Sequence, residues 1–298
     1  MKTKLILLAG LALLTSSCDN VIYPSDDTSR VTAPVTIHVN DFSITQSEFP
    51  DTGTRAVTDV KDYKPVEAVT LALYNGNTEV YKTTQFKSDK STYTTFGEFS
   101  CQLPIGTYKM VALGYGYFVG DEFSITSPTE AVFISERPRE MLCFTQDVTV
   151  TKTSPLDLTV TLDRINSWLY IESTDGRSAS ATKIRTTFAK GDKGFNPTTG
   201  FALSDKGFTQ INNPSAKTGD PIKIGIYPFL YSDEETMDVT IEAMDDSNTV
   251  LFTKTITNVA FKRGYKTTIK GPIFTAGASS VGFNLNPDWG TGETYMFD

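Results

Sequence analysis

Short stretches in which apolar and polar residues alternate, separated by turn residues, recur along most of this 298-residue chain. One of the clearest covers residues 156–162, and others lie at 35–39 and 69–73. Alternation with a period of two places the apolar side chains on one face of a strand. The sequence contains no convincing amphipathic helix of ten or more residues. Short strands with turn signals every eight to twelve residues are typical of β-sandwiches.

The composition supports the same fold class and excludes one class of partner. Aromatic, threonine and β-branched residues are abundant, which favours strands. The chain has 27 Lys+Arg against 35 Asp+Glu, and without Lys2 and Lys4 of the leader the balance is 25 minus 35, or −10. Because such an acidic chain without a Lys/Arg cluster offers no basic face, we expect no nucleic-acid partner.

The first eighteen residues have the form of a bacterial lipoprotein signal. Lys2 and Lys4 precede an apolar run at 5–14, which is too short to span a bilayer, and small residues lead to Cys18. We predict a signal peptide at 1–17 and acylation of Cys18, which would hold the protein at the outer membrane, exposed on the cell surface. Secretion with a chance cysteine is the alternative.

The rest of the chain divides by composition into a tether and two domains. Residues 18–34 are rich in Asp, Ser, Thr and Pro and predict a flexible tether. The polar stretch at 151–155 ends in proline and suggests a boundary. We therefore expect an all-β protein with two tandem β-sandwich domains of the transthyretin-like or immunoglobulin-like kind, at 35–153 and 154–298.

Two cysteines remain after Cys18, and their state is left open by the sequence. Cys101 and Cys143 both lie in apolar segments. Outside the cytoplasm they could form a disulfide. Two buried free thiols are the alternative, since cysteine is among the most buried residue types.

The sequence offers little for catalysis, and we expect no enzyme, cofactor or metal site. The single histidine, His38, lies on the polar face of a strand, which makes serine-type triads and histidine metal sites hard to build. Acidic runs at 233–235 and 245–246 fit no calcium loop and are interpreted as solvated turns. Carboxylate pairs of the glycosidase type stay open, because any acidic chain contains candidates.

Several local sequences, with the lipidated start, resemble the fimbrillin superfamily of Bacteroidetes, and more closely its FimB/Mfa2-like fimbrial anchor or minor subunit lipoproteins. They are LTVTLDR at 158–164, LPIGTY at 103–108 and FKRGYKTTIKG at 261–271, which leads to Asp288-Trp289. The resemblance implies a lipid-anchored structural subunit of a cell-surface fimbria whose partners are other fimbrial subunits.

The resemblance also implies assembly by donor-strand exchange, in which a neighbour's strand fills an apolar groove. Arg55, followed by Ala56, lies where a trypsin-like protease would cut to free the first strand, and the alternative is an ordinary loop arginine. Such a cut would remove the lipid, so an anchor should resist it. Candidate donor segments are 35–39 and 281–285.

A surface glycan-binding lipoprotein is the alternative function. It would use exposed aromatic residues such as Tyr115, Tyr117 or Trp289. Coplanar rings on one open face would favour this function, and buried rings would count against it. More often a string such as Tyr115 to Phe118 is a strand end that packs into the core.

Overall fold

The computed structural model describes residues 31–43, 57–118, 123–275 and 294–296. This part of the chain is all β, which confirms the predicted fold class, and none of it forms a helix that could cross a membrane. Its strands are β1 (Thr32–Ser43), β2 (Val57–Asp59), β3 (Ala68–Asn75), β4 (Thr78–Phe86), β5 (Glu98–Pro104), β6 (Gly106–Tyr115), β7 (Phe123–Ser127), β8 (Glu130–Phe133), β9 (Met141–Val150), β10 (Leu156–Arg164), β11 (Trp168–Ser173), β12 (Lys183–Phe188), β13 (Gly194–Phe195), β14 (Phe208–Asn212), β15 (Lys223–Ile226), β16 (Glu234–Met244), β17 (Val250–Lys262), β18 (Lys266–Gly271) and β19 (Thr294–Met296).

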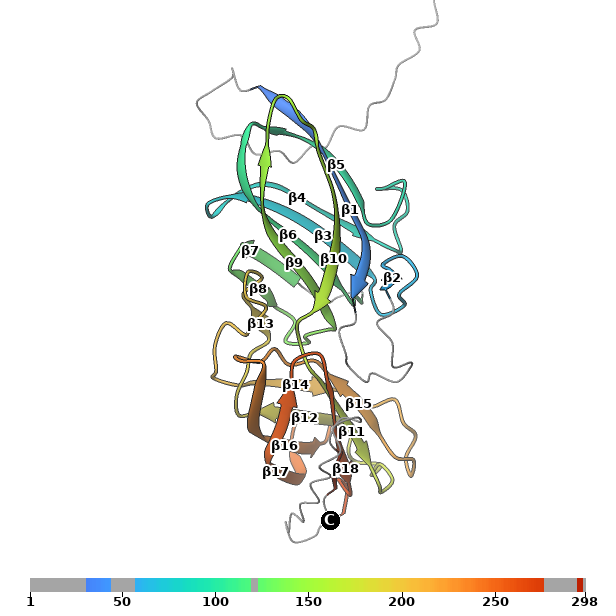
Figure 1. Ribbon diagram of the computed structural model, residues 1–298. Coiled ribbons are helices and arrows are strands. Elements are labelled where there is room, and N and C mark those ends of the chain that lie inside the picture. The colour runs from blue at the N-terminus through green and yellow to red at the C-terminus, as the bar shows by residue number, and fades with distance from the viewer. Residues whose placement is uncertain (1–30, 44–56, 119–122, 276–293, 297–298) are drawn as a thin grey trace, which may run out of the picture.

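The strands form two stacked parts, an N-terminal half up to Arg164 and a C-terminal half from Ile165 (Figure 1). The N-terminal half is built on an eight-stranded sheet in the order β2-β1-β10-β9-β6-β3-β4, with β5 also paired to β1. A first hydrophobic cluster lies inside this sheet and receives side chains from β1, β3, β5, β6, β9 and β10.

One glutamine joins β4 to β5, which do not pair as strands. The Gln85 side chain donates from Nε2 to the Glu98 carbonyl and accepts from the Gly97 N–H, both at 2.7 Å. Gly97 itself has φ +93°, and a Cβ there would lie 2.4 Å from the Val39 carbonyl oxygen. Only glycine fits this close approach. The eight-stranded sheet is thereby curled around its core.

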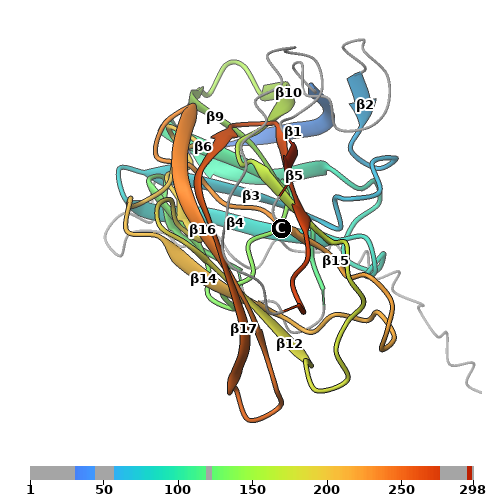
Figure 2. The same cartoon turned by 90° about the horizontal axis from the view of Figure 1, so that it is seen from below.

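The C-terminal half is a sandwich of two four-stranded sheets. One has the order β15-β11-β18-β19 and the other β14-β12-β16-β17. Figure 2 shows this half from below, with β12, β14, β16 and β17 along one side and β15 on the other. A second hydrophobic cluster fills the space between the sheets, as alternation on both inner faces requires.

A third hydrophobic cluster joins the two halves. It lies on the outer face of β3, β6 and β9, so β3 is buried on both faces along almost its whole length. Strand β13, from the C-terminal half, pairs with β8 of the N-terminal half in the small sheet β13-β8-β7. Phe229 and Phe195 stack at 4.6 Å between centroids, and Phe133 lies 6.3 Å from Phe229.

The boundary between the halves differs from the one expected at 153/154. Strand β10, which would open the C-terminal domain, pairs with β1 in parallel and with β9 in the eight-stranded sheet. Its alternating leucines face the first cluster. The chain therefore leaves the first sheet after Arg164 rather than before Leu156, because backbone pairing rather than the proline-ended loop decides where β10 belongs.

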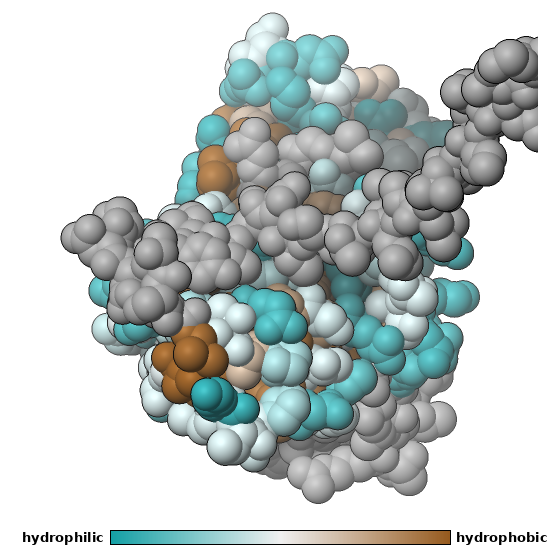
Figure 3. Space-filling model, turned by 90° about the horizontal axis from the view of Figure 1, so that it is seen from above, coloured by the Kyte–Doolittle hydropathy of each residue, from teal (hydrophilic) through white to brown (hydrophobic). Residues whose placement is uncertain are grey.

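The described surface is mainly hydrophilic. In the view from above, teal and white residues cover most of it, and brown is confined to small groups (Figure 3). Small apolar groups of this kind are normal on the surface of folded proteins.

Candidate functional site

The first strand, β1, lies inside the eight-stranded sheet rather than at its edge. One side pairs in parallel with β10, and the other pairs antiparallel with β5 and then with β2. Val35, Ile37 and Val39 alternate into the first cluster and are at most 1% exposed. Burying three such side chains stabilises the folded protein by roughly 5 to 9 kcal/mol. β1 is therefore a core strand, although it is the first described strand in the sequence.

The polar face of β1 carries the single histidine. His38 Nε2 lies 3.1 Å from Asp157 Oδ1 on β10, and Nδ1 lies 3.5 Å from Glu98 Oε1 on β5. The imidazole thus connects β1 to both of its neighbours at a part-exposed position. Exposed pairs of this kind contribute little, about 0 to 1 kcal/mol.

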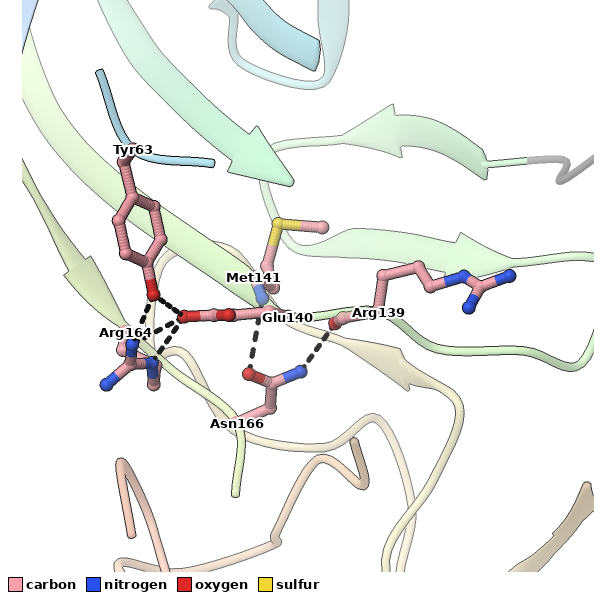
Figure 4. A network of polar contacts seen from close by, with 6 residues as sticks. All are labelled: Tyr63, Arg139, Glu140, Met141, Arg164 and Asn166. Atoms are coloured by element: carbon pink, nitrogen blue, oxygen red, sulfur yellow. Dashed lines mark hydrogen bonds and ion pairs between the residues drawn. The ribbon is translucent and has the colours of Figure 1, made fainter. Parts of the chain in front are cut away.

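A buried polar triangle near the junction joins Tyr63, which follows β2, Glu140, which precedes β9, and Arg164, the last residue of β10 (Figure 4). The Glu140 carboxylate accepts hydrogen bonds from Arg164 Nε at 2.8 Å and from the Tyr63 hydroxyl at 2.6 Å. Arg164 Nη2 also donates to both partners. The Arg164 and Glu140 side chains are only 4% and 7% exposed. Burial and the adjacent Glu140 charge raise the pKa of Tyr63 above its ordinary value, so its hydroxyl stays protonated.

Asn166 holds the crossing point between the halves. Its Nδ2 donates to the Arg139 carbonyl at 2.7 Å, and its Oδ1 accepts from the Met141 N–H at 3.2 Å (Figure 4). Its own carbonyl accepts from Gly264 of the C-terminal half. Nearby, burial raises the pKa of Tyr227 to about 12. Asn166 is completely buried and bonded on both sides of the junction.

The hydrogen bonds of these groups join the segment after β2, the segment before β9 and the end of β10. The carboxylate, guanidinium and phenol of the triangle bind one another. Within the described residues, no group of three or more His, Cys, Asp and Glu side chains is placed to hold a metal ion.

Several predicted site residues lie outside the described residues. They are Cys18, Arg55, Ala56, Trp289 and the donor segment at 281–285. The other candidate donor segment, 35–39, lies within β1.

The two remaining cysteines are free thiols buried in different clusters. Cys101 lies on β5 in the first cluster, and Cys143 lies on β9 in the third. The Cys143 thiol donates to the Pro197 carbonyl oxygen at 3.4 Å. The structure therefore contains the free-thiol arrangement and not the bridge.

Of the aromatic residues considered for glycan binding, the two described ones, Tyr115 and Tyr117, do not form an open platform. Tyr115 is 4% exposed within the third cluster, and Tyr117 packs against Phe86 with the ring centroids 4.7 Å apart. Trp168 and Tyr227, which the sequence did not single out, stack at 14°, but both rings are half-buried.

The acidic runs have partners, and the run at 233–235 differs from the expected turn because Glu234 and Glu235 are the first residues of β16. Asp233 pairs with Arg263 and Glu234 with Lys262, each at 2.7 Å, while the Asp245 carboxylate accepts from the Thr249 N–H. Sequence reasoning missed Tyr63, Glu140, Arg164 and Asn166. Only one of them had a signal in the sequence: Arg164 is a charged residue at the end of the strand predicted from the 156–162 alternation.

The fold defines the protein as an all-β protein of two halves. Its first described strand, β1, lies in the interior of the eight-stranded sheet, and buried polar residues lie where the two halves meet. The chain belongs to DUF6562, a family of unknown function, whose profile matches residues 28–295. None of the curated proteins compared with the chain matches it.

Solved structures similar to this chain include surface proteins of Bacteroidetes. A candidate adhesin from Bacteroides ovatus has 12% identity, covers 88% of this chain and 92% of its own, and gives a TM-score of 0.47. A candidate polysaccharide-binding protein from Bacteroides thetaiotaomicron has 12% identity, coverages of 76% and 80%, and a TM-score of 0.46. The fimbrial anchor protein Mfa2 from Porphyromonas gingivalis has 10% identity, coverages of 77% and 84%, and a TM-score of 0.42.

A member of the group that the local sequences resemble, Mfa2, is thus among the similar structures. Likenesses of this strength do not carry an argument about activity, ligand or assembly.

Proposed function

We propose that this protein is a lipid-anchored structural subunit of a cell-surface fimbria, held at the outer membrane through Cys18 and joined to other subunits by exchanged strands. It acts as an anchor or minor subunit and performs no catalysis. The lipoprotein form of residues 1–18 supports the anchoring, and the local sequences at 103–108, 158–164 and 261–271 support the fimbrial assignment.

The position of β1 is the observation that carries this proposal. β1 begins at Thr32, inside the stretch 18–34 that was expected to be a tether, and Arg55 lies between β1 and the rest of the fold in sequence. Its removal would expose the edges of β5 and β10 and an apolar row once filled by Val35, Ile37 and Val39. Such a groove accepts an extended strand through backbone hydrogen bonds and alternate side-chain pockets.

Mass spectrometry of the protein recovered from its own cell surface tests the proposal. An acylated start at Cys18 in assembled fibres is the expected result for an anchor. A start at Ala56 in the fibres would make the protein a polymerising subunit instead. Recovery only as an unassembled monomer would contradict both fimbrial roles.

A binding measurement tests strand exchange directly. The chain from residue 19, cut after Arg55, is mixed with a labelled peptide of residues 32–43. We expect this peptide to enter the groove, and a matched peptide with Ile37→Asp to fail because it places a charge in the core. Equal binding of both peptides would contradict a register-specific groove.

A further inference from the structure

We propose that β1 controls the stiffness of the junction between the two halves through the Tyr63–Glu140–Arg164 triangle. When β1 is paired in the sheet, the junction opens rarely; when β1 is absent, the junction opens more often. The inference goes beyond the proposed function and holds with or without fimbrial assembly, because it concerns only contacts within this chain.

β1 is the shared strand partner of the two segments that carry Tyr63 and Arg164. On one side, Asp41–Ser43 of β1 pair with Val57–Asp59 of β2, and β1 is the strand partner of β2 within the described residues. On the other side, β1 pairs with β10 along its length up to Asp163. β10 pairs with β9 only at Asp163 and Arg164.

Tyr63 is connected to β2 by a tight turn. The N–H groups of Asp62 and Tyr63 both donate to the carbonyl of Asp59, the last residue of β2, at 2.9 and 3.2 Å. The ring of Tyr63 therefore depends for its position on where β2 ends. Arg164 is likewise the residue that follows Asp163, the last partner of β1 on β10.

Loss of any one member of the triangle leaves a buried charge or polar group without one of its hydrogen bonds. Glu140 and Arg164 are a buried ion pair, and such pairs are favourable only when further hydrogen bonds satisfy them. The Tyr63 hydroxyl supplies one of these bonds to Glu140 and accepts one from Arg164. Displacing Tyr63 therefore weakens the contact between the ends of β9 and β10.

That contact is the start of the junction. Directly after Arg164, the N–H of Ile165 donates to the Met141 carbonyl next to Glu140. In the opposite direction, the N–H of Met141 donates to Asn166 Oδ1 of the C-terminal half at 3.2 Å. Hydrogen exchange of the Ile165 and Met141 amides measures opening of the junction, because each amide is protected by a bond between the two halves.

Amide hydrogen exchange of the chain from residue 19 tests the proposal with single and double variants. Thr58→Pro removes a backbone donor from β2 and weakens its pairing with β1 without touching the triangle. Tyr63→Phe removes the hydroxyl. Thr209→Pro, on the edge strand β14 of the other sandwich, is the matched control, and the amides of β12 that face β16 are the internal reference for global opening.

We expect Thr58→Pro and Tyr63→Phe each to speed exchange at Ile165 and Met141 about tenfold relative to the reference. The double variant should exchange no faster than Tyr63→Phe, because both act through the same hydroxyl. Thr209→Pro should leave these amides unchanged. Unchanged exchange in Thr58→Pro, or effects that multiply in the double variant, would overturn the proposal.

Discussion

Two buried polar side chains, Glu140 and Gln85, are satisfied by groups from other segments of the chain. Glu140 meets Tyr63 and Arg164, and Gln85 meets the backbone of residues 97 and 98. A buried donor or acceptor that loses its partner costs far more than a surface bond is worth. The largest single-residue effects are therefore expected at these positions.

Glu140→Gln should lower the free energy of unfolding by about 3 to 5 kcal/mol, because it leaves the Arg164 charge buried without its counter-ion. Urea unfolding measures the change. Glu136→Gln is the matched control: its ion pair with Lys193 is largely exposed, and its loss should cost less than about 1 kcal/mol. Equal costs for the two variants would contradict the importance of burial here.

Gln85→Leu should cost about 2 kcal/mol or more, since the Gly97 N–H and the Glu98 carbonyl both lose their side-chain partner. Gln102→Leu, on the exposed face of β5, should change stability by less than about 0.5 kcal/mol. Chemical denaturation of both variants checks the comparison. A neutral Gln85→Leu would mean that β4 and β5 do not depend on this amide.

The thiol of Cys143 makes stability depend on alkaline pH. Burial raises its pKa from an ordinary 9 to about 12. Between these values the unfolded chain loses the proton and the folded chain keeps it, so stability falls as the pH rises from 9 to 12. Relative to Cys143→Ala, the protein should lose up to about 1.4 kcal/mol per pH unit in this range. A constant difference between the two proteins from pH 8 to 11 would contradict this.

At the scale of elements, the strands that alternate cleanly could be predicted, and their neighbours could not. The runs at 35–39, 69–73 and 156–162 are all strands, because one apolar face is enough to specify each. The parallel pairing of β1 with β10 brings together residues more than 100 positions apart, and no local pattern encodes it. For the same reason β10 was assigned to the wrong side of the boundary.

The candidate site was only partly predictable at this scale. The segment 35–39 was singled out from its alternation, and its burial follows from that pattern. The triangle was missed because Tyr63, Glu140 and Arg164 each stand next to a strand end in sequence, where charged and aromatic residues are common. Their significance comes from meeting in three dimensions.

The buried side chains of β1 should contribute more to the free energy of unfolding than the side chains on its opposite face. Ile37→Ala, at a fully buried position, should cost about 2 to 4 kcal/mol. Thr36→Ala, on the opposite face of the same strand, should stay within about 0.5 kcal/mol. Thermal and urea unfolding of the two variants measure this difference, and similar losses for both would be inconsistent with one-sided burial.

At the scale of the whole molecule, the third cluster makes the two halves one unit. Strand β13 extends a sheet of the N-terminal half, and Phe195 and Phe229 add their rings to its aromatic residues. A shared core of this kind couples unfolding of the halves, in contrast to tandem domains joined only by a linker.

The intact chain should therefore unfold in a single calorimetric transition. Phe229→Ala should cost about 3 to 5 kcal/mol and separate the melting of the two halves into two transitions, because it removes the ring between Phe133 and Phe195. Phe252→Ala, inside the C-terminal half, should lower stability without splitting the transition. Two transitions in the intact chain would contradict the coupling.

The placement of β1 between β5 and β10 also fixes how the fold responds to tension. Backbone hydrogen bonds in a sheet lie across the strands. A pull on the chain ahead of Thr32 runs along β1, so it strains the ladders on both sides together instead of opening them one rung at a time. Loaded from that end, the protein resists by shear, the geometry in which a strand is hardest to extract.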